Sequence, residues 1–425
     1  MSLTRLKIIE EAKRMASIYD HTPSLLDHWI ETFGIENTEY LLRNLRKPLE
    51  TLWVQVNTSR VDIDSVRDML DGMDFKVKKH RYFEDFLEVE VELRELKDDG
   101  IRYPRIIVDR EAIPNAALGK DILTADIINY DKFETGDTLR IVYKGERLLA
   151  LGKAEISSEL ISTAPQRVIA KNTSSLAYAP PLTELEFYRR GYFSILTPVQ
   201  AIGIKSMYHS TKDNILIMST DNGEAASYIS ELTDQKVPIT VIAQNKEHSR
   251  VLQKTFARTK SKSVRILVDT FPQFVRINQE IKFTSAYLEL KNSRSSVIPS
   301  FRSNLSISAL EKMVKKQIRI TSNLFRCLYD QASITYVTHS IDNFENEKIF
   351  ENLVSKSYYK SQSFPQEIRE YQNKGDFSTR YIKPAEEDKI ALERKISTIF
   401  LDPLKIKNTG GFIAKFKFTP KKIEN

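Results

Sequence analysis

The sequence predicts an α/β protein in which a Rossmann-like domain follows an α+β N-terminal region and a small β-barrel. Three patterns support this order. Apolar residues recur at helical spacing over residues 3–46, short apolar runs separated by Gly, Pro and Asp fill residues 101–160, and strands alternate with helices after residue 183. That alternation is typical of a doubly wound parallel sheet. We therefore expect four parts, over residues 1–50, 51–98, 101–170 and 176–425.

The N-terminal parts are expected to be a helical region and a small α+β domain. Pro23 can open a second helix and Gly34 can end it. From Leu52 the pattern changes to alternation, and the runs LWVQVNT and FLEVEVEL predict strands on either side of a helix near residues 62–71. Paired prolines within residues 171–183 predict a linker before the last domain.

The third part resembles a PUA domain, a small barrel that binds RNA. The resemblance rests on ALGKDIL at residues 117–123, on Gly136-Asp137 and on ALGKA at residues 150–154. It implies an RNA-binding surface, and we expect Lys120 and Lys153, which flank the turn glycines, to take part in it. Each glycine can instead serve only a turn.

The last domain resembles the Nol/Nop/Sun family of RNA cytosine-5 methyltransferases, in its PUA-bearing branch. The similarity runs from Gly191 to Lys417, and its most specific pieces are THSI at residues 338–341, ENE at 345–347 and TGGFIAK at 409–415. The resemblance implies a methyltransferase fold that uses S-adenosylmethionine and acts on tRNA or rRNA. Two cysteines of the family perform the attack on cytosine and the release of product.

Both cysteine positions are changed in this chain. They correspond to His339 and Asn292, and Glu289 stands at the family aspartate that contacts the cytosine ring. A thiolate must add to carbon 6 before carbon 5 becomes nucleophilic, and neither an imidazole nor an amide replaces the sulfur. His339 is read as a base, a ligand or a satisfied pocket residue, and Glu289 as a ring contact or a structural group. The one cysteine, Cys327, is expected in the core.

The cofactor motif of the family is also altered. The glycine-rich loop corresponds to residues 217–226, where Glu224 replaces one glycine, Ala225 replaces the lysine, and Ala243 occupies the ribose-binding acid position. A negative charge at Glu224 is expected to oppose the methionine carboxylate. Only Asp269 keeps an acid beside the adenine, as a vestigial ligand or merely as a turn or helix cap. We therefore expect no cofactor, with S-adenosylmethionine only if the enzyme is active, and no metal site.

Basic residues suggest where RNA could bind. Arg250, Lys254 and Arg258 recur at steps of four and are expected to share one helix face, where a phosphate backbone would relieve their repulsion. A solvated face paired with Glu247 is the alternative. The lysines of the tail, among them Lys415, can face solvent or RNA beside buried phenylalanines.

Composition limits the function classes. The formal charge of +7 and a pI near 9.0 favour a polyanionic partner. One cysteine excludes an internal disulfide framework and indicates a cytoplasmic location, and no run of about 18 apolar residues predicts a membrane span.

Together these patterns predict an RNA-binding homologue of tRNA or rRNA cytosine-5 methyltransferases, a pseudoenzyme that holds structured RNA or a protein partner. An active methyltransferase with a rearranged site and a structural subunit of a protein complex are the alternatives.

Overall fold

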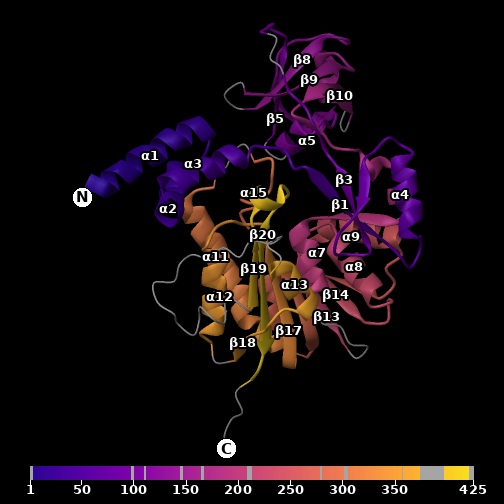
Figure 1. The fold of residues 1–425 in the computed structure, drawn as a ribbon, viewed down its shortest axis with the longest axis vertical. Helices are drawn as coiled ribbons and strands as arrows, with labels where there is room; N and C mark the ends of the chain where they lie inside the picture. The colour runs from indigo at the N-terminus through magenta and orange to yellow at the C-terminus, as the bar shows by residue number, and fades with distance from the viewer. Residues whose placement is uncertain are drawn as a thin grey trace, which may run out of the picture.

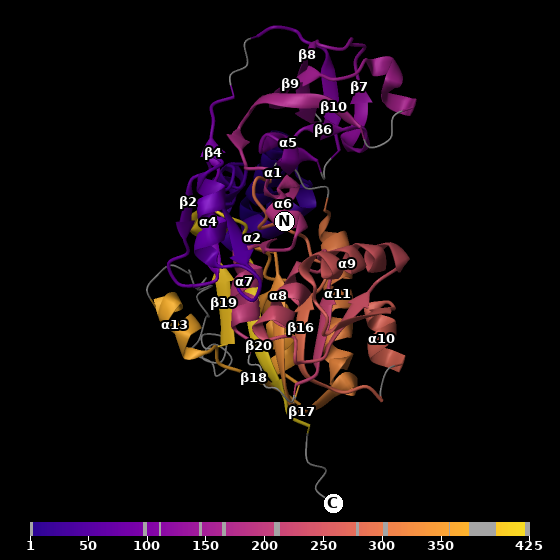
Figure 2. The ribbon, with the colours of Figure 1, turned by 90° about the vertical axis from the view of Figure 1, so that its right-hand side faces the viewer.

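The computed structural model describes residues 3–96, 100–109, 112–143, 147–163, 167–207, 213–277, 280–300, 305–356, 358–373 and 397–420. A barrel lies at one end of the molecule, a large α/β domain lies at the other, and a helical layer and a small sheet lie between them (Figures 1 and 2). The predicted fold class is confirmed. The exact domain bounds stay a proposal, because the elements described below cross some of them.

Three helices form the N-terminal layer: α1 (Leu3–Tyr19), α2 (Pro23–Phe33) and α3 (Ile35–Asn44). Pro23 opens α2, and Gly34 follows its last residue with a φ of 83°, a left-handed value that suits glycine. The indole Nε1 of Trp29 donates to Asp342 Oδ2 at 3.0 Å. Because Asp342 lies in the loop after β17 (Leu328–Thr338), the helical layer holds that loop in place.

A four-stranded antiparallel sheet follows, in the order β12-β1-β3-β2. Its strands are β1 (Thr51–Val56), β2 (Val77–Lys79), β3 (Phe86–Glu90) and β12 (Phe193–Leu196), and α4 (Ile63–Asp71) packs on it. β12 comes from beyond the barrel and the predicted linker, and its Ser194 lies opposite Gln55 of β1. The chain thus leaves this sheet, builds the barrel and returns to complete the sheet.

The barrel is a six-stranded sheet in the order β6-β10-β9-β8-β5-β7. Its elements are β5 (Arg105–Val108), α5 (Ile113–Ala117), β6 (Ile122–Leu123), η1 (Thr124–Asp126), β7 (Ile127–Tyr130), β8 (Thr138–Tyr143), β9 (Arg147–Ala154), η2 (Ser158–Thr163) and β10 (Val168–Ser175). It has a core of its own. β4 (Glu92–Leu93) and β11 (Ala177–Tyr178) pair where the chain enters and leaves the barrel, and Arg147 donates to the Ile18 carbonyl of α1.

The C-terminal domain contains an eight-stranded sheet with the order β15-β14-β13-β16-β17-β20-β18, and β19 also pairs with β20. The first five strands in that order are mutually parallel, and β20 is antiparallel to β17. The strands are β13 (Ile215–Ser219), β14 (Ile239–Ala243), β15 (Val264–Val268), β16 (Phe283–Glu289), β17, β18 (Tyr359–Ser361), β19 (Thr398–Leu401) and β20 (Gly411–Phe418).

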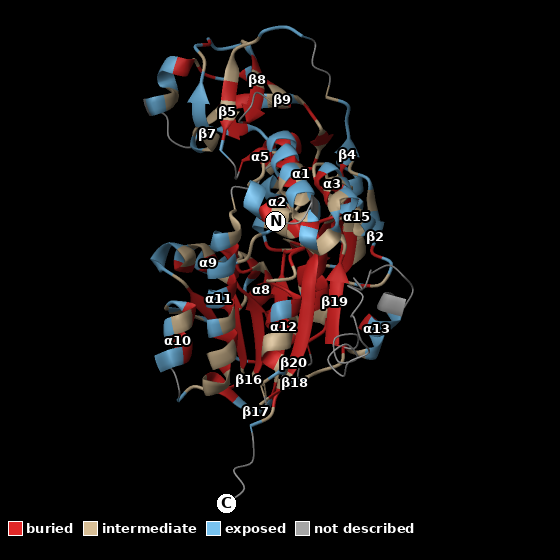
Figure 3. Cartoon of the chain, turned by 90° about the vertical axis from the view of Figure 1, so that its left-hand side faces the viewer, coloured by how far each residue is buried: buried red, intermediate tan, exposed pale blue. Residues whose placement is uncertain are grey.

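Helices cover both faces of this sheet. One face packs on α7 (Pro198–Lys205), α8 (Glu224–Leu232) and α9 (Lys246–Thr259), and the other packs on α10 (Phe271–Ile277), α11 (Ile307–Asn323) and α12 (Glu347–Val354). Ile217 packs in the core beneath α7, α8 and α9, and Met218 packs in the core beneath α10, α11 and α12, because successive side chains of a strand point to opposite faces. Figure 3 shows the central strands of the sheet as buried, with exposed positions on helices such as α10 and α11 beside them.

The remaining short elements are η3 (Leu182–Glu184), α6 (Glu186–Arg189), η4 (Leu324–Cys327), α13 (Gln366–Asn373) and α15 (Pro403–Ile406). None of the helices in the described part of the chain is long and apolar enough to cross a membrane.

Candidate functional site at the carboxyl edge of the parallel sheet

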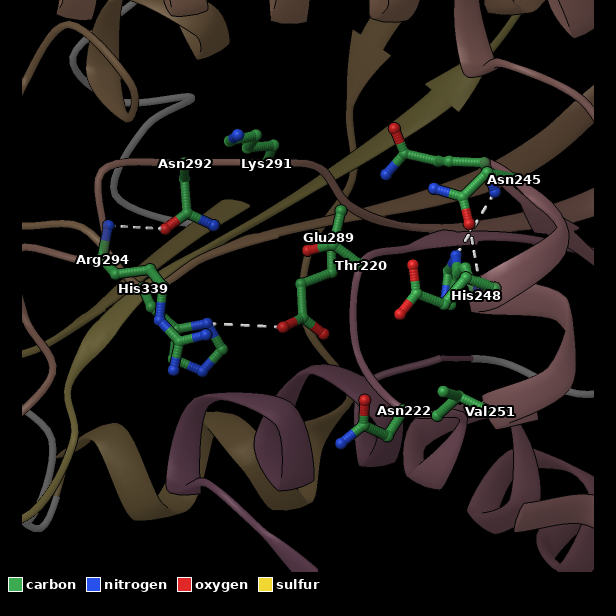
Figure 4. A pocket seen from close by; sticks show the side chains of 12 residues that line it. Thr220, Asn222, Asn245, His248, Val251, Glu289, Lys291, Asn292, Arg294 and His339 are labelled. Carbon is green, nitrogen blue, oxygen red and sulfur yellow. Dashed lines mark hydrogen bonds and ion pairs between the residues drawn. The ribbon is translucent and has the colours of Figure 1, made fainter. Parts of the chain in front are cut away.

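A pocket opens where the strand order of the parallel sheet reverses. β13 lies between β14 and β16. From β13 the chain proceeds to β14 and β15 on one side and then crosses to β16 on the other side. Ligands of doubly wound sheets bind at such a switch point, outside the carboxyl ends of the strands. The pocket has a volume of about 540 Å³, within the usual range for small-molecule sites (Figure 4). Its lining residues are Thr220, Asn222, Gln244, Asn245, Glu247, His248, Val251, Glu289, Lys291, Asn292, Arg294 and His339.

Glu289 is the last residue of β16 and is 5% exposed. Its carboxyl accepts from Gln200 Nε2 at 3.1 and 3.2 Å, from Ser219 Oγ at 3.3 Å and from the hydroxyl of Tyr287 at 3.2 Å. Burial, reinforced by the negative charge of Asp221, raises the pKa of Glu289 to about 8. The group therefore carries a proton at neutral pH and can donate a hydrogen bond.

His339 follows the end of β17 and faces Glu289, with Nδ1 3.4 Å from Glu289 Oε1. Its Nε2 lies 2.9 Å from the hydroxyl of Thr197, the residue that caps α7. Burial, together with the positive charge of Arg294, lowers the pKa of His339 to about 3, so the ring is neutral. Thr197 thus holds one side of the His339 ring by a hydrogen bond, and the other side of the ring faces the Glu289 carboxyl in the wall of the pocket.

Asn292 lies in the loop after β16 and also lines the pocket. Its amide nitrogen donates to the Leu290 carbonyl at 2.9 Å, and its oxygen accepts from Arg294 N at 3.0 Å. The structure therefore brings Glu289, Asn292 and His339 together, as their places in the sequence motifs imply.

The site contains no thiol. Cys327 lies in η4, just before β17, whereas His339 follows the other end of this 11-residue strand. β17 is irregular near its start: Leu328 pairs with Phe283 and Tyr336 with Leu288, which are five residues apart on β16 and thus roughly 17 Å apart at about 3.3 Å per residue, and His339 lies three residues further on. Cys327 is buried, as expected, and burial raises the pKa of its thiol to about 11.

The loop between β13 and α8 differs from the expectation for Glu224. This carboxylate pairs with Arg258 at 2.7 Å and accepts from the hydroxyl of Tyr188 at 2.9 Å, with the two charged side chains 14% and 13% exposed. The guanidinium of Arg258 stacks on the Tyr188 ring at 3.9 Å. Glu224 is thus neutralised outside the pocket and does not oppose a ligand, while Arg258 is withdrawn from any RNA surface. The sequence did not reveal this pairing because the two residues are 34 positions apart.

Several pocket residues were missed by the sequence analysis. Gln244 and Asn245 follow β14 directly, one and two positions beyond Ala243, and His248 reaches the loop after β13, with Nε2 3.0 Å from the Asp221 carbonyl. The place of Gln244 directly after a predicted strand was the signal in the sequence that could have indicated it. Asp269 is not among the residues that line the pocket, and its carboxylate accepts from Thr270 N at 2.7 Å, as a turn residue does.

The other basic residues named from the sequence lie at the surface. Lys120 and Lys153 are exposed on the barrel, and Arg250 and Lys254 are exposed on α9. Among the described residues, no group of three or more His, Cys, Asp or Glu side chains is placed to hold a metal ion.

Comparisons with known proteins agree with this architecture. Residues 104–176 match the PUA domain family. A tRNA (cytosine(72)-C(5))-methyltransferase of Pyrococcus horikoshii is 21% identical over 245 residues, which are 57% of this chain and 63% of that protein. The aligned part thus spans less than two thirds of the relative.

Two solved structures have the same fold. NSun6 from Pyrococcus horikoshii, solved with SFG, superposes with a TM-score of 0.81 and 19% identity. The match covers 95% of this chain and 100% of the NSun6 chain. A methyltransferase homologue from Pyrococcus horikoshii covers 98% of this chain and all of its own, with a TM-score of 0.59 and 12% identity.

These comparisons correct two expectations. The chain was expected to be a pseudoenzyme and to take no cofactor, but the curated relative is a methyltransferase and NSun6 was solved with SFG, an analogue of S-adenosylmethionine. Catalytic inactivity does not follow from the altered motifs, since the pocket is formed and Glu224 lies outside it. The chain is a homologue of tRNA cytosine-5 methyltransferases of the Sun/NSun6 group, with a PUA domain and their methyltransferase fold.

Proposed function

We propose that the chain is an S-adenosylmethionine-dependent methyltransferase that acts on structured RNA of the tRNA class. The observation that carries this proposal is the pocket at the switch point of a methyltransferase fold, in a chain that also has a PUA domain. The location that we propose is the cytoplasm, and this part rests on the single cysteine.

The residues at the β14 end of the pocket suit the adenosine half of the donor. Gln244 and Asn245 would hold ribose hydroxyls or an adenine edge through their amide groups, and Val251 would add an apolar contact. Asn245 also caps α9 by accepting from His248 N at 2.8 Å, which fixes this wall. When bound, S-adenosylmethionine would supply an electrophilic methyl group.

The residues at the β17 end suit the RNA base. Protonated Glu289 and the hydrogen-bonded ring of His339 form a rigid wall whose donors and acceptors can orient a base edge. Because Glu289 is protonated at neutral pH, it would donate a hydrogen bond to the base and would not remove a proton from it.

The absence of a thiol limits the acceptor atom. Carbon 5 of cytosine needs covalent activation, and Cys327, the one cysteine of the chain, lies at the far end of β17. We therefore propose an acceptor with its own lone pair: a ring nitrogen, an exocyclic amine or a ribose hydroxyl.

RNA would lie across the barrel and α9. Lys120 and Lys153 expose positive charge on the barrel, and Arg250 and Lys254 do so on α9, whose first turn contributes His248 to the pocket. Phosphate contacts from these side chains would position the RNA without reading its sequence. Partner proteins stay an alternative ligand of the same surface.

Methyl transfer to total tRNA tests the proposal. The protein is incubated with tRNA and methyl-labelled S-adenosylmethionine, and the digested nucleosides are separated by mass spectrometry. We expect a labelled nucleoside other than 5-methylcytosine. No label in any RNA, with both ligands bound, would contradict methyl transfer, whereas labelled 5-methylcytosine would contradict the acceptor that we propose.

A further inference from the structure

The loop between β13 and α8 already contains a carboxylate where a ligand could place one. Asp221 accepts from Gly223 N and from Ala225 N, each at 3.1 Å, through its two carboxylate oxygens. N–H groups at the start of a helix attract anions, and here the chain supplies the anion itself. A ligand carboxylate in this place would have to displace Asp221 and would face its charge.

Positive charge lies on the opposite wall of the pocket. Lys291 and Arg294 belong to the loop after β16, and the pairing of Glu289 with Ser219 sets that loop beside the end of β13 (Figure 4). Arg294 has a left-handed φ of 57°, and the hydrogen bond from its N–H to Asn292 keeps this turn closed. Both cations are exposed, and neither forms an ion pair within the part of the chain that the structure describes.

We propose that Lys291 and Arg294 hold the carboxylate at the amino-acid end of the adenosyl ligand, in place of the N-terminus of α8. The assignment rests on the proposed function, because it specifies how that pocket takes its donor. A carboxylate is the natural partner of an arginine and a lysine, since each can form a charge-assisted hydrogen bond to it.

Two ligands that differ only at this end provide the test. S-adenosylhomocysteine has the amino acid, whereas 5′-methylthioadenosine keeps the adenosine and the thioether without it. Isothermal titration of the full chain is done with the wild type, with the double variant Lys291→Met/Arg294→Met, and with the control Arg250→Met/Lys254→Met on α9, outside the pocket lining. We expect the first double variant to lose about tenfold in affinity for S-adenosylhomocysteine and to keep its affinity for methylthioadenosine.

The outcomes separate the two proposals. Equal losses for both ligands, or an unchanged affinity for S-adenosylhomocysteine, would overturn the role of Lys291 and Arg294 while leaving the pocket as an adenosyl site. Binding of methylthioadenosine alone by the wild type would overturn it as well. If neither ligand binds the wild type, the proposed function fails, and this inference fails with it. A loss that is confined to S-adenosylhomocysteine and absent from the α9 control supports it.

Discussion

At the residue scale, the protonated carboxyl of Glu289 gives the site a definite dependence on pH. Its pKa is raised from 4.5 to about 8 by burial and by Asp221. Between these values the folded state keeps a proton that the unfolded state releases, so the stabilisation is complete below pH 4.5 and is lost as the pH rises towards 8. His339 has a lowered pKa and acts in the opposite direction only below its ordinary value of 6.5.

The variant Glu289→Gln removes this titration. The unfolding free energy of the wild type should therefore fall relative to that of the variant as the pH rises from 5 to 8. Urea denaturation at several pH values measures both. Glu184→Gln, at an exposed position, is the control and should give a constant difference. Parallel stability curves for wild type and Glu289→Gln would show that Glu289 is ionised in the folded protein.

The pair of Arg258 with Glu224 makes a second prediction. Removing one partner of a largely buried ion pair leaves the other charge without compensation, so Arg258→Ala should cost about 3 kcal/mol of unfolding free energy. Arg250→Ala, on the same helix but exposed, should change it by less than about 0.5 kcal/mol. Similar values for the two variants, from denaturant titrations, would contradict the neutralisation of Glu224.

At the scale of the elements, α9 has two different faces, which periodicity alone could not separate. The spacing of four residues predicted that Arg250, Lys254 and Arg258 share one face of the helix. Arg258 instead forms an ion pair with Glu224, which lies 34 positions earlier in the sequence. Similarly, the lysines of the tail, among them Lys415, were expected to face solvent or RNA. Instead β20 lies between β17 and the strands β18 and β19, and Lys415 is fully buried, donates to the Ser206 carbonyl and has a pKa lowered to about 7 by burial.

RNA binding is predicted to depend on α9 and on the barrel. Charge reversal of Arg250 and Lys254, or of Lys120 and Lys153, should weaken binding of tRNA and reduce the slope of log K against log salt by about 2 for each pair. Filter binding at several salt concentrations measures both.

Reversal of Lys312 and Lys316 is the matched control for this prediction. They are exposed basic residues on α11, which covers the other face of the sheet. Equal losses of RNA affinity from all three pairs of substitutions would mean that only the net charge of the protein attracts RNA. Unchanged affinity after substitution on α9 and on the barrel would mean that these two faces only contact solvent.

At the scale of the whole molecule, local patterns predicted more than long-range contacts. The order of helical layer, barrel and parallel sheet follows from the periods of the apolar residues and from turn residues such as Pro23 and Gly34. The motifs also placed Glu289, Asn292 and His339 together, because residues after parallel strands meet at one edge. The pairing of β12 with β1 in the four-stranded sheet could not be predicted. The whole barrel separates the two strands in sequence, and no local pattern of residues indicates such a long-range pairing.

The N-terminal helices should affect the site through Asp342. Trp29 and Asp342 are each 1% exposed, so Trp29→Phe leaves a buried carboxylate without one of its donors and should cost about 1–3 kcal/mol. Hydrogen exchange of the loop after β17 should become faster in the variant, while exchange in the barrel stays unchanged. Unaltered exchange in that loop would show that the helical layer does not hold it.

The most direct test of a methyltransferase site that works without a thiol is methyl transfer by a chain without cysteine. Cys327→Ala removes the one sulfhydryl, and its melting temperature is recorded so that loss of fold is recognised. We predict that the folded variant transfers labelled methyl groups from S-adenosylmethionine to tRNA at the wild-type rate and gives the same nucleoside. Transfer by the wild type that disappears in the folded variant, or the absence of transfer from both, would contradict this.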